Sequence, residues 1–230
     1  LSLLLLDIRR FKEVNDLHGH QVGDQLLVSV ADRLQKISHA YGPLARLSGD
    51  EFAMLVADAD IRNINDLVEQ LRSAVTQPLQ LERRVFNLDV SIGYARYPHD
   101  VKQASELFNA TSIALHHAKR RDNSTCPYTQ AMHHALQRRQ RMTERLSVAI
   151  SENKLALYFQ PQVDLASGQL TGAEALCRWH DAEWGWVSPG EFIPLAEERG
   201  LIRLLGDWVL EESARQLMAW GTQNKQALPG

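Results

Sequence analysis

Two adjacent acidic residues follow a small, turn-forming pair within the segment Arg46–Val56. Asp50 and Glu51 come directly after Ser48 and Gly49, and apolar residues typical of strands flank them on both sides. This pattern predicts a β-hairpin whose tip carries negative charge, with Gly49 free to take a positive φ and to let the backbone approach a ligand closely. A carboxylate at such a tip can bind a metal, because the two flanking strands hold it in place.

Another carboxylate, Asp7, ends the apolar run Leu3–Leu6, which predicts a buried strand. If this strand lies next to the hairpin, Asp7 and Asp50 reach the same edge of the sheet and can share divalent cations. Mg²⁺ (or Mn²⁺) suits such a site, because Mg²⁺ takes one or two carboxylates and completes its shell with water and phosphate oxygens. The alternative is that these acids merely end their strands.

Two motifs resemble one known family. Residues Ser48–Phe52 resemble the GGDEF signature of diguanylate cyclases, with serine in place of the first glycine. The segment Asp7–Asp16, followed by Gly19-His20 and Gly23-Asp24, resembles the family's second signature. The pentapeptide alone is a weak signal, whereas the two motifs in the right order are specific. The resemblance implies an α/β palm-like fold with a largely antiparallel sheet, shared with nucleotidyl cyclases and polymerases. It also implies the condensation of two GTP molecules into cyclic di-GMP with release of pyrophosphate.

The resemblance implies roles for the acidic residues. Asp7, Asp50 and the backbone carbonyl of Ile8 would bind the metal ions, which neutralise triphosphate charge during phosphoryl transfer. Glu51 would lie nearest the attacking hydroxyl, and its role, as a base or as a metal partner, stays open. Because each site holds one of the two reacting nucleotides, we expect a homodimer for catalysis.

Four further residues match the family's nucleotide-binding positions. Asn15 and Asp24 match positions that read guanine, since an amide and a carboxylate can pair with O6, N1 and N2 of the purine. Lys12 and Lys119 match positions on the phosphate side. The alternatives are a turn residue for Asn15, a helix N-terminal charge for Asp24 and a solvated side chain for Lys119.

The sequence departs from the family's pattern at several positions. Ser48 adds a hydroxymethyl group beside the nucleotide, and Arg9 replaces a common acid and places positive charge beside Asp7. His39–Gly42 stand where an Arg-x-x-Asp motif is usual, so we expect no feedback by cyclic di-GMP there. Asp122–Ser124 replace Gly-Arg-Asn and remove a phosphate-binding arginine. These departures keep a second hypothesis open, a non-catalytic GTP-binding module that regulates the following domain.

Hydrophobic periodicity predicts the elements of this first domain, which we place at residues 1–128. The expected helices are 10–17, 21–37, 64–75 and 104–120, and the expected strands are 3–6, the two hairpin strands, 86–92 and 126–128. A connecting helix follows within the linker 129–153. Its arginines, Arg138, Arg139, Arg141 and Arg145, are interpreted as the solvated face of a linker rather than a nucleic-acid surface.

The third segment, 154–230, opens with two predicted strands at 157–164 and 170–179, joined by a turn at 166–168. Glu174-Ala175-Leu176 resembles the EAL signature of cyclic di-GMP phosphodiesterases, and Tyr158–Pro161 and Phe192–Glu197 match its neighbours. The resemblance implies the opening part of a TIM-type barrel. In it Glu174 would bind a metal, and Gln160 and Arg178 would face the substrate, with Arg178 on a phosphate. We expect this half-site to be inactive here, because the sequence stops before the family's catalytic centre.

Composition sets limits on the class of protein. An apolar content of 44% suffices for real cores, and a net charge of −3 argues against a general nucleic-acid surface. The two cysteines fit no metal-ligand spacing, so we expect a reduced, cytoplasmic setting. No apolar run approaches the ~20 residues that cross a bilayer. We expect both ends to be cut from a longer chain, so that any membrane attachment would come through the missing parts.

Overall fold

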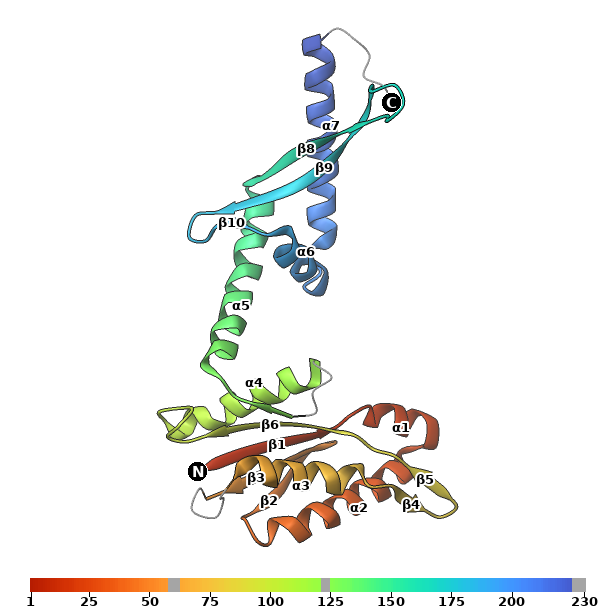
Figure 1. The fold of residues 1–230 in the computed structure, drawn as a ribbon, viewed down its shortest axis with the longest axis vertical. Coiled ribbons are helices and arrows are strands. Elements are labelled where there is room, and N and C mark those ends of the chain that lie inside the picture. Colours follow the sequence, from red (N-terminus) through yellow and green to blue (C-terminus); the bar gives the residue numbers. More distant parts are fainter. Residues whose placement is uncertain (58–62, 121–124, 225–230) are drawn as a thin grey trace. The chain divides into compact units, whose positions relative to one another are not determined.

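The computed structural model describes residues 1–57, 63–120 and 125–224. The chain divides into two compact units, Leu1–His134 and Ala135–Gly230, and each is described by itself (Figure 1). Among the described residues, no helix combines the length and the apolar character that crossing a membrane requires.

The first unit is built on a five-stranded sheet with the order β2-β3-β1-β6-β7. Its strands are β1 (Ser2–Ile8), β2 (Leu44–Ser48), β3 (Glu51–Val56), β6 (Val90–Arg96) and β7 (Thr125–Pro127). The central strand β1 pairs antiparallel with β3 and β6, β2 pairs antiparallel with β3, and only β7 runs parallel to its neighbour. The expected α/β domain with an antiparallel-rich sheet is confirmed.

Helices cover both faces of this sheet (Figure 1). The helices α1 (Phe11–His18), α2 (His20–Ser38) and α3 (Ile64–Thr76) share one core with Leu4, Leu6 and Ile8 of β1. A short 3-10 turn leads into α4 (Leu107–Arg120), which packs on the other face against Leu3 and Leu5. Alternate residues of a strand point to opposite faces, so burial on both faces explains the continuous apolar run Leu3–Leu6 of β1.

The predicted strand at 86–92 is wrong in one respect, because it consists of two strands. The hairpin formed by β4 (Leu79–Leu81) and β5 (Arg84–Phe86) ends before β6 begins at Val90. Phe86, Leu88 and Val90 are all buried in the same core. The apolar alternation therefore continues from β5 into β6, although β5 pairs with β4 and β6 pairs with β1.

The second unit contains α5 (Gln130–Ser151) from Ala135 onward, β8 (Leu155–Val163), β9 (Leu170–Asp181), β10 (Gly185–Val187), α6 (Pro189–Glu198) and α7 (Ile202–Asn224). Its strands form an antiparallel sheet with the order β10-β9-β8. Leu146 of α5, Trp179 of β9 and Phe192 of α6 lie in one buried cluster. The pairing of β8 with β9 agrees with the two predicted strands, and β10 was not predicted.

The arginines of α5 lie on a partly exposed face, and the sequence did not predict the ion pairs that they form there. All four reach acidic side chains of the same unit. Arg139 pairs with Glu198. The other three pair as follows: Arg138 with Glu191 at 3.1 Å, Arg141 with Glu183 at 2.8 Å and Arg145 with Asp181 at 2.7 Å. The same three guanidinium groups lie 5.3, 5.9 and 5.2 Å from the centre of the Trp184 ring. Because arginine stacks on aromatic faces, this cluster fastens α5 to the β9–β10 turn and to α6.

Candidate active site at the acidic hairpin

The tip of the β2–β3 hairpin is joined to the end of β1. Gly49 and Asp50 form the turn, and Glu51, the first residue of β3, lies in register with Asp7. The amide of Ile8 donates to the carbonyl of Asp50 at 3.3 Å. Gly49 has a φ of +50°, as expected for a glycine turn, and its carbonyl accepts a hydrogen bond from Arg46 Nε at 2.8 Å. The structure therefore places Asp7, Asp50 and Glu51 at one end of the sheet.

Lys119 of α4 joins this acidic group. Its Nζ lies 2.5 Å from Asp7 Oδ2 and 3.5 Å from Glu51 Oε1. The fold dictates this contact, because Asp7 lies on the same face of β1 as Leu5, which packs against Leu115 of α4. Lys119 follows Leu115 by one helical turn and so reaches the carboxylates beyond the apolar contact.

Burial and charge shift the pKa values of this pair. Burial raises the pKa of Asp7, whose side chain is only 13% exposed, and the negative charges of Asp50 and Glu51 add to the rise, although Lys119 opposes it. Desolvation lowers the pKa of Lys119, but its hydrogen bond to Asp7 and the charges of Asp7 and Glu51 outweigh this effect, and the net pKa is raised. Lys119 therefore stays charged, and its positive charge stabilises the ionised form of Asp7, which burial disfavours.

The donor set suits a hard divalent cation. Asp7 and Glu51 offer carboxylate oxygens at one place, and a cation, the ammonium of Lys119, already bridges them. No group of three or more His, Cys, Asp or Glu side chains is arranged as a metal cage in the part of the chain that the structure describes. Mg²⁺ accepts such an open site, because it retains water and phosphate oxygens in its shell.

The predicted guanine-reading residues lie on α1 and α2. Asn15 Oδ1 is buried and has no hydrogen-bond partner within the described residues. A Cβ on Gly23 would stand only 1.9 Å from this oxygen, so the absence of a side chain at Gly23 makes room for the amide. Asp24 is exposed directly after Gly23, and Lys12 is exposed in the first turn of α1. An unpaired buried acceptor is costly and suits a ligand with N–H donors.

The departures from the family's pattern have structural counterparts. Arg9 Nη1 pairs with Asp89 Oδ2 at 3.3 Å, so its charge is engaged by the segment before β6. Ser48 lies at an irregularity in the pairing of β2 with β3 and is exposed. Asp122–Ser124 lie outside the described residues.

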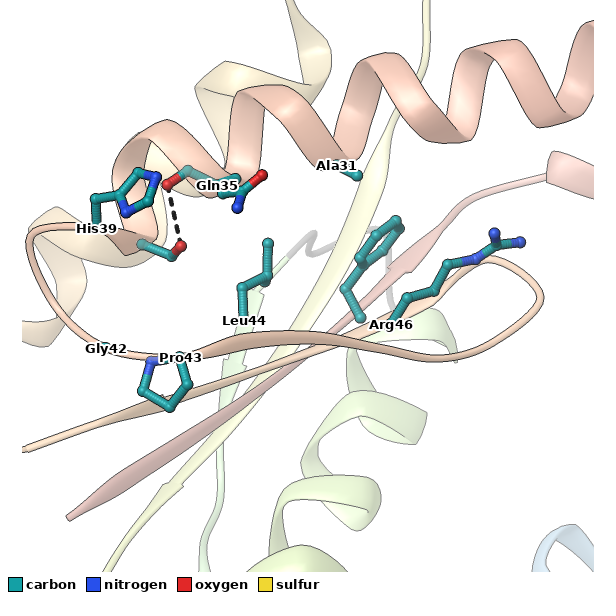
Figure 2. Close-up of a pocket in the computed structure, with 9 residues that line it drawn as sticks. Ala31, Gln35, His39, Gly42, Pro43, Leu44 and Arg46 are labelled. Carbon is teal, nitrogen blue, oxygen red and sulfur yellow. Dashed lines mark hydrogen bonds between the residues drawn. The ribbon is translucent and has the colours of Figure 1, made fainter.

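The segment His39–Gly42, which replaces the expected Arg-x-x-Asp motif, borders a pocket of about 530 Å³ between α2 and β2. Figure 2 shows Gln35 and His39 at the end of α2 and Leu44 and Arg46 on β2 around this space. A Cβ on Gly42 would meet the carbonyl oxygen of Leu55 at 2.2 Å, so the backbones approach too closely for an aspartate at Gly42. The absence of cyclic di-GMP feedback at this place stays a prediction.

The predicted phosphodiesterase residues share one face of the β8–β9 sheet. Gln160 of β8 lies in register with Glu174 of β9. Arg178 lies four residues after Glu174 on β9, so its side chain is on the same face of the sheet. Arg178 stacks over the Tyr158 ring at 5.7 Å. Leu155 and Trp179, on the opposite alternation, belong to the buried core. The three polar residues therefore line the face away from that core.

Comparisons with known proteins agree with this geometry. The family model of the diguanylate cyclase GGDEF domain matches residues 1–125, and the EAL domain model matches residues 143–229. The chain therefore belongs to the GGDEF family, and the resemblance to GGDEF and EAL proteins is confirmed.

Two curated relatives come from Pseudomonas aeruginosa. The bifunctional diguanylate cyclase/cyclic di-GMP phosphodiesterase MucR is 37% identical over 220 residues, covering 95% of this chain and 32% of MucR. The cyclic di-GMP phosphodiesterase NbdA is 36% identical over 219 residues, covering 94% of this chain and 28% of NbdA. The chain thus spans about a third or less of the length of these relatives.

Two solved structures resemble the first unit. An EAL/GGDEF domain protein from M. capsulatus matches with a TM-score of 0.51 and 32% identity, covering 56% of this chain and 84% of that chain. A GGDEF domain of TpbB from Pseudomonas aeruginosa matches with a TM-score of 0.54 and 29% identity, covering 59% of this chain and 81% of that chain. Both support the GGDEF fold.

Proposed function

We propose that the first unit is a diguanylate cyclase domain that condenses two GTP molecules into cyclic di-GMP and releases pyrophosphate. The observation that carries the proposal is the group Asp7, Glu51 and Lys119, in which two carboxylates in register on adjacent strands share one cation. Such a group provides oxygen ligands for metals and a positive charge for phosphates at one place. The GGDEF membership of residues 1–125 supports the same reaction.

The residues divide the work of binding and reaction. Asn15 Oδ1, buried and unpaired, accepts hydrogen bonds from guanine N–H groups, with Asp24 as the second acceptor. Lys12 and Lys119 contact the phosphates. When bound, Mg²⁺ or Mn²⁺, held by Asp7, Asp50 and the carbonyl of Ile8, neutralises triphosphate charge and lowers the pKa of the attacking 3′-hydroxyl.

Glu51 is the remaining acid of the group, and the turn at Gly49 gives the nucleotide access to the backbone. Glu51 either takes the proton of the 3′-hydroxyl or supports the metal. A homodimer brings together two such sites, each with one GTP. Two sites are needed because the 3′-hydroxyl of each GTP attacks the α-phosphate of the other.

We place the whole chain in cyclic di-GMP signalling in the cytoplasm, where GTP is available. The match of residues 143–229 to the EAL model and the names of MucR and NbdA support a phosphodiesterase partner domain for the cyclase. In it Glu174 binds a metal, and Gln160 and Arg178 face cyclic di-GMP. In this proposal residues 129–153 join the domains 1–128 and 154–230, and Leu146 of this segment packs in the core of the second unit.

The test is incubation of the protein with GTP and Mg²⁺, followed by chromatography of the nucleotides. We expect cyclic di-GMP from the wild type and from the control Asp32→Asn, an exposed acid of α2, and a loss of at least a hundredfold in Asp50→Asn. GTP that stays bound but unchanged in every variant would overturn catalysis and support a GTP-binding regulatory module, favoured by Arg9 and Ser48.

A further inference from the structure

Lys119 occupies the place where the acidic group would bind a cation. Its ammonium lies 2.5 Å from Asp7 Oδ2 and 3.5 Å from Glu51 Oε1, so it touches both carboxylates that are in register on adjacent strands. A divalent cation bound to the same Asp7 oxygen would lie within a few ångströms of this charge. The two cations repel one another, so they compete for Asp7.

We infer that Lys119 is a built-in competitor for the divalent cation, and that metal binding moves its ammonium from Asp7 and Glu51 to the phosphates of the nucleotide. This inference rests on the proposed function of the first unit. It gives Lys119 a second role beside phosphate contact, as a positioning residue that acts through the metal site.

In the metal-free protein, the carboxylates of Asp7, Asp50 and Glu51 need a positive charge beside them. Asp7 is 13% exposed, and a buried carboxylate without a partner is costly. Asp50 and Glu51 add two more negative charges at the same end of the sheet. Lys119 therefore stabilises the metal-free fold, and the divalent cation must replace that stabilisation when it binds.

The structure also allows the ammonium to move. Lys119 is 38% exposed and lies in the last turn of α4, so its four-carbon stem has open space on the solvent side. The helix itself stays fixed, because Leu115 and Ala118 are buried against the sheet. Displacement is therefore a side-chain movement that leaves α4 in place.

Metal and nucleotide binding are coupled as a result. The metal alone has to displace Lys119 into solvent, whereas the metal with a triphosphate gives the displaced ammonium a new anionic partner. Each ligand then raises the affinity of the other, and this coupling is reciprocal. Removal of the ammonium should strengthen the binding of the metal alone and weaken its coupling to the nucleotide.

The experiment measures Mn²⁺ binding to the protein without nucleotide, by the electron paramagnetic resonance signal of free Mn²⁺. We expect Lys119→Met to bind Mn²⁺ about fivefold more tightly than the wild type, and Lys119→Arg, which keeps the charge, to stay near the wild type. The matched control is Lys36→Met, which removes an exposed lysine of α2. If Lys119→Met melts below the assay temperature, Lys119→Gln replaces it.

A second measurement adds GTP and follows the gain in Mn²⁺ affinity. The gain should be at least fivefold smaller in Lys119→Met than in the wild type. Equal or weaker Mn²⁺ binding by Lys119→Met without nucleotide would overturn the competitor role. Absence of Mn²⁺ binding in every variant, with and without GTP, would instead overturn the metal site of the proposed function, and with it this inference.

Discussion

Gly93 of β6 lies directly beneath the backbone of Leu115 on α4. A Cβ on Gly93 would stand 2.1 Å from the amide nitrogen of Leu115, a distance that no repacking of side chains relieves. Gly93 is in register with Leu5 of β1, two residues before Asp7. The close approach of helix to sheet therefore sets how far Lys119 reaches over the carboxylates.

Replacing Gly93 by alanine should displace α4 and separate Lys119 from Asp7. We expect a loss of about 3 kcal/mol in the free energy of unfolding, because overpacking at a backbone contact forces the helix away from the strand. Urea denaturation measures the loss. The control is Gly206→Ala in α7, where a Cβ meets nothing within 4 Å and the better helix propensity of alanine should raise stability. An unchanged midpoint in Gly93→Ala would contradict the close contact.

Replacing Gly23 by alanine should weaken the recognition of guanine. The new Cβ would stand 1.9 Å from Asn15 Oδ1, so the amide must rotate out of its buried position. We expect GTP affinity to fall about tenfold, because a buried acceptor is worth on the order of 1.4 kcal/mol to a matched ligand. Isothermal titration with GTP measures this effect.

Two comparisons make that result specific to the amide. Val28→Ala, at an exposed position of the same helix, should leave GTP affinity unchanged. Mn²⁺ affinity should also stay unchanged in Gly23→Ala, because the metal-binding acids lie on other elements. A parallel loss of Mn²⁺ binding would indicate general disruption rather than a displaced Asn15.

The sequence predicts the first unit well because its signals are local. The hairpin at Ser48–Phe52 and the apolar strand before Asp7 each follow from residues next to one another in the chain. The contact of Lys119 with Asp7 could not be derived in this way, since 112 residues separate the two and only the packing of α4 on β1 brings them together. The sequence offers one clue, which is that Lys119 continues the apolar spacing of Leu115.

The ion pairs of the α5 arginines could not be predicted from the sequence either. Arg138, Arg141 and Arg145 stand at helical spacing on a polar segment, a pattern that is equally typical of a solvated face. Their acceptors come from other elements: Glu191 of α6 for Arg138, Glu183 of the β9–β10 turn for Arg141, and Asp181 at the end of β9 for Arg145. All three arginines also stack on the ring of Trp184 in that turn. Periodicity cannot identify such partners, because it describes one element at a time.

Removal of Trp184 should weaken the packing of α5 against the rest of the second unit. The ring faces three guanidinium groups at 5.3, 5.9 and 5.2 Å, so Trp184→Ala removes three cation–π contacts together with buried area. We expect a loss of about 2 to 3 kcal/mol in the free energy of unfolding of this unit. The matched control is Trp186→Ala in the neighbouring strand β10, a tryptophan that is 60% exposed and should cost less than about 1 kcal/mol. Equal losses in the two variants would contradict the fastening role of Trp184.

The network around Asp181 should make the second unit sensitive to acid. Burial opposes ionisation of Asp181, but hydrogen bonds from Arg145 and from the amides of Glu183 and Trp184 outweigh it and lower the pKa of this carboxyl below its ordinary value of 3.8. A lowered pKa means that the unfolded chain binds the proton more readily than the folded one. The stabilisation is therefore fully present above pH 3.8 and is lost as the pH falls through the lower, folded value.

Denaturation of the second unit between pH 6 and about pH 2 measures this loss. Asp181→Asn should be less stable than the wild type at pH 6, because Arg145 loses a charged partner, and the difference should shrink as the pH falls below 3.8. Asp207→Asn, an exposed carboxylate outside this network, should show the acid-induced loss of the wild type. A difference between Asp181→Asn and the wild type that stays constant across this range would mean that Asp181 stabilises the turn by hydrogen bonding alone and that its charge contributes nothing.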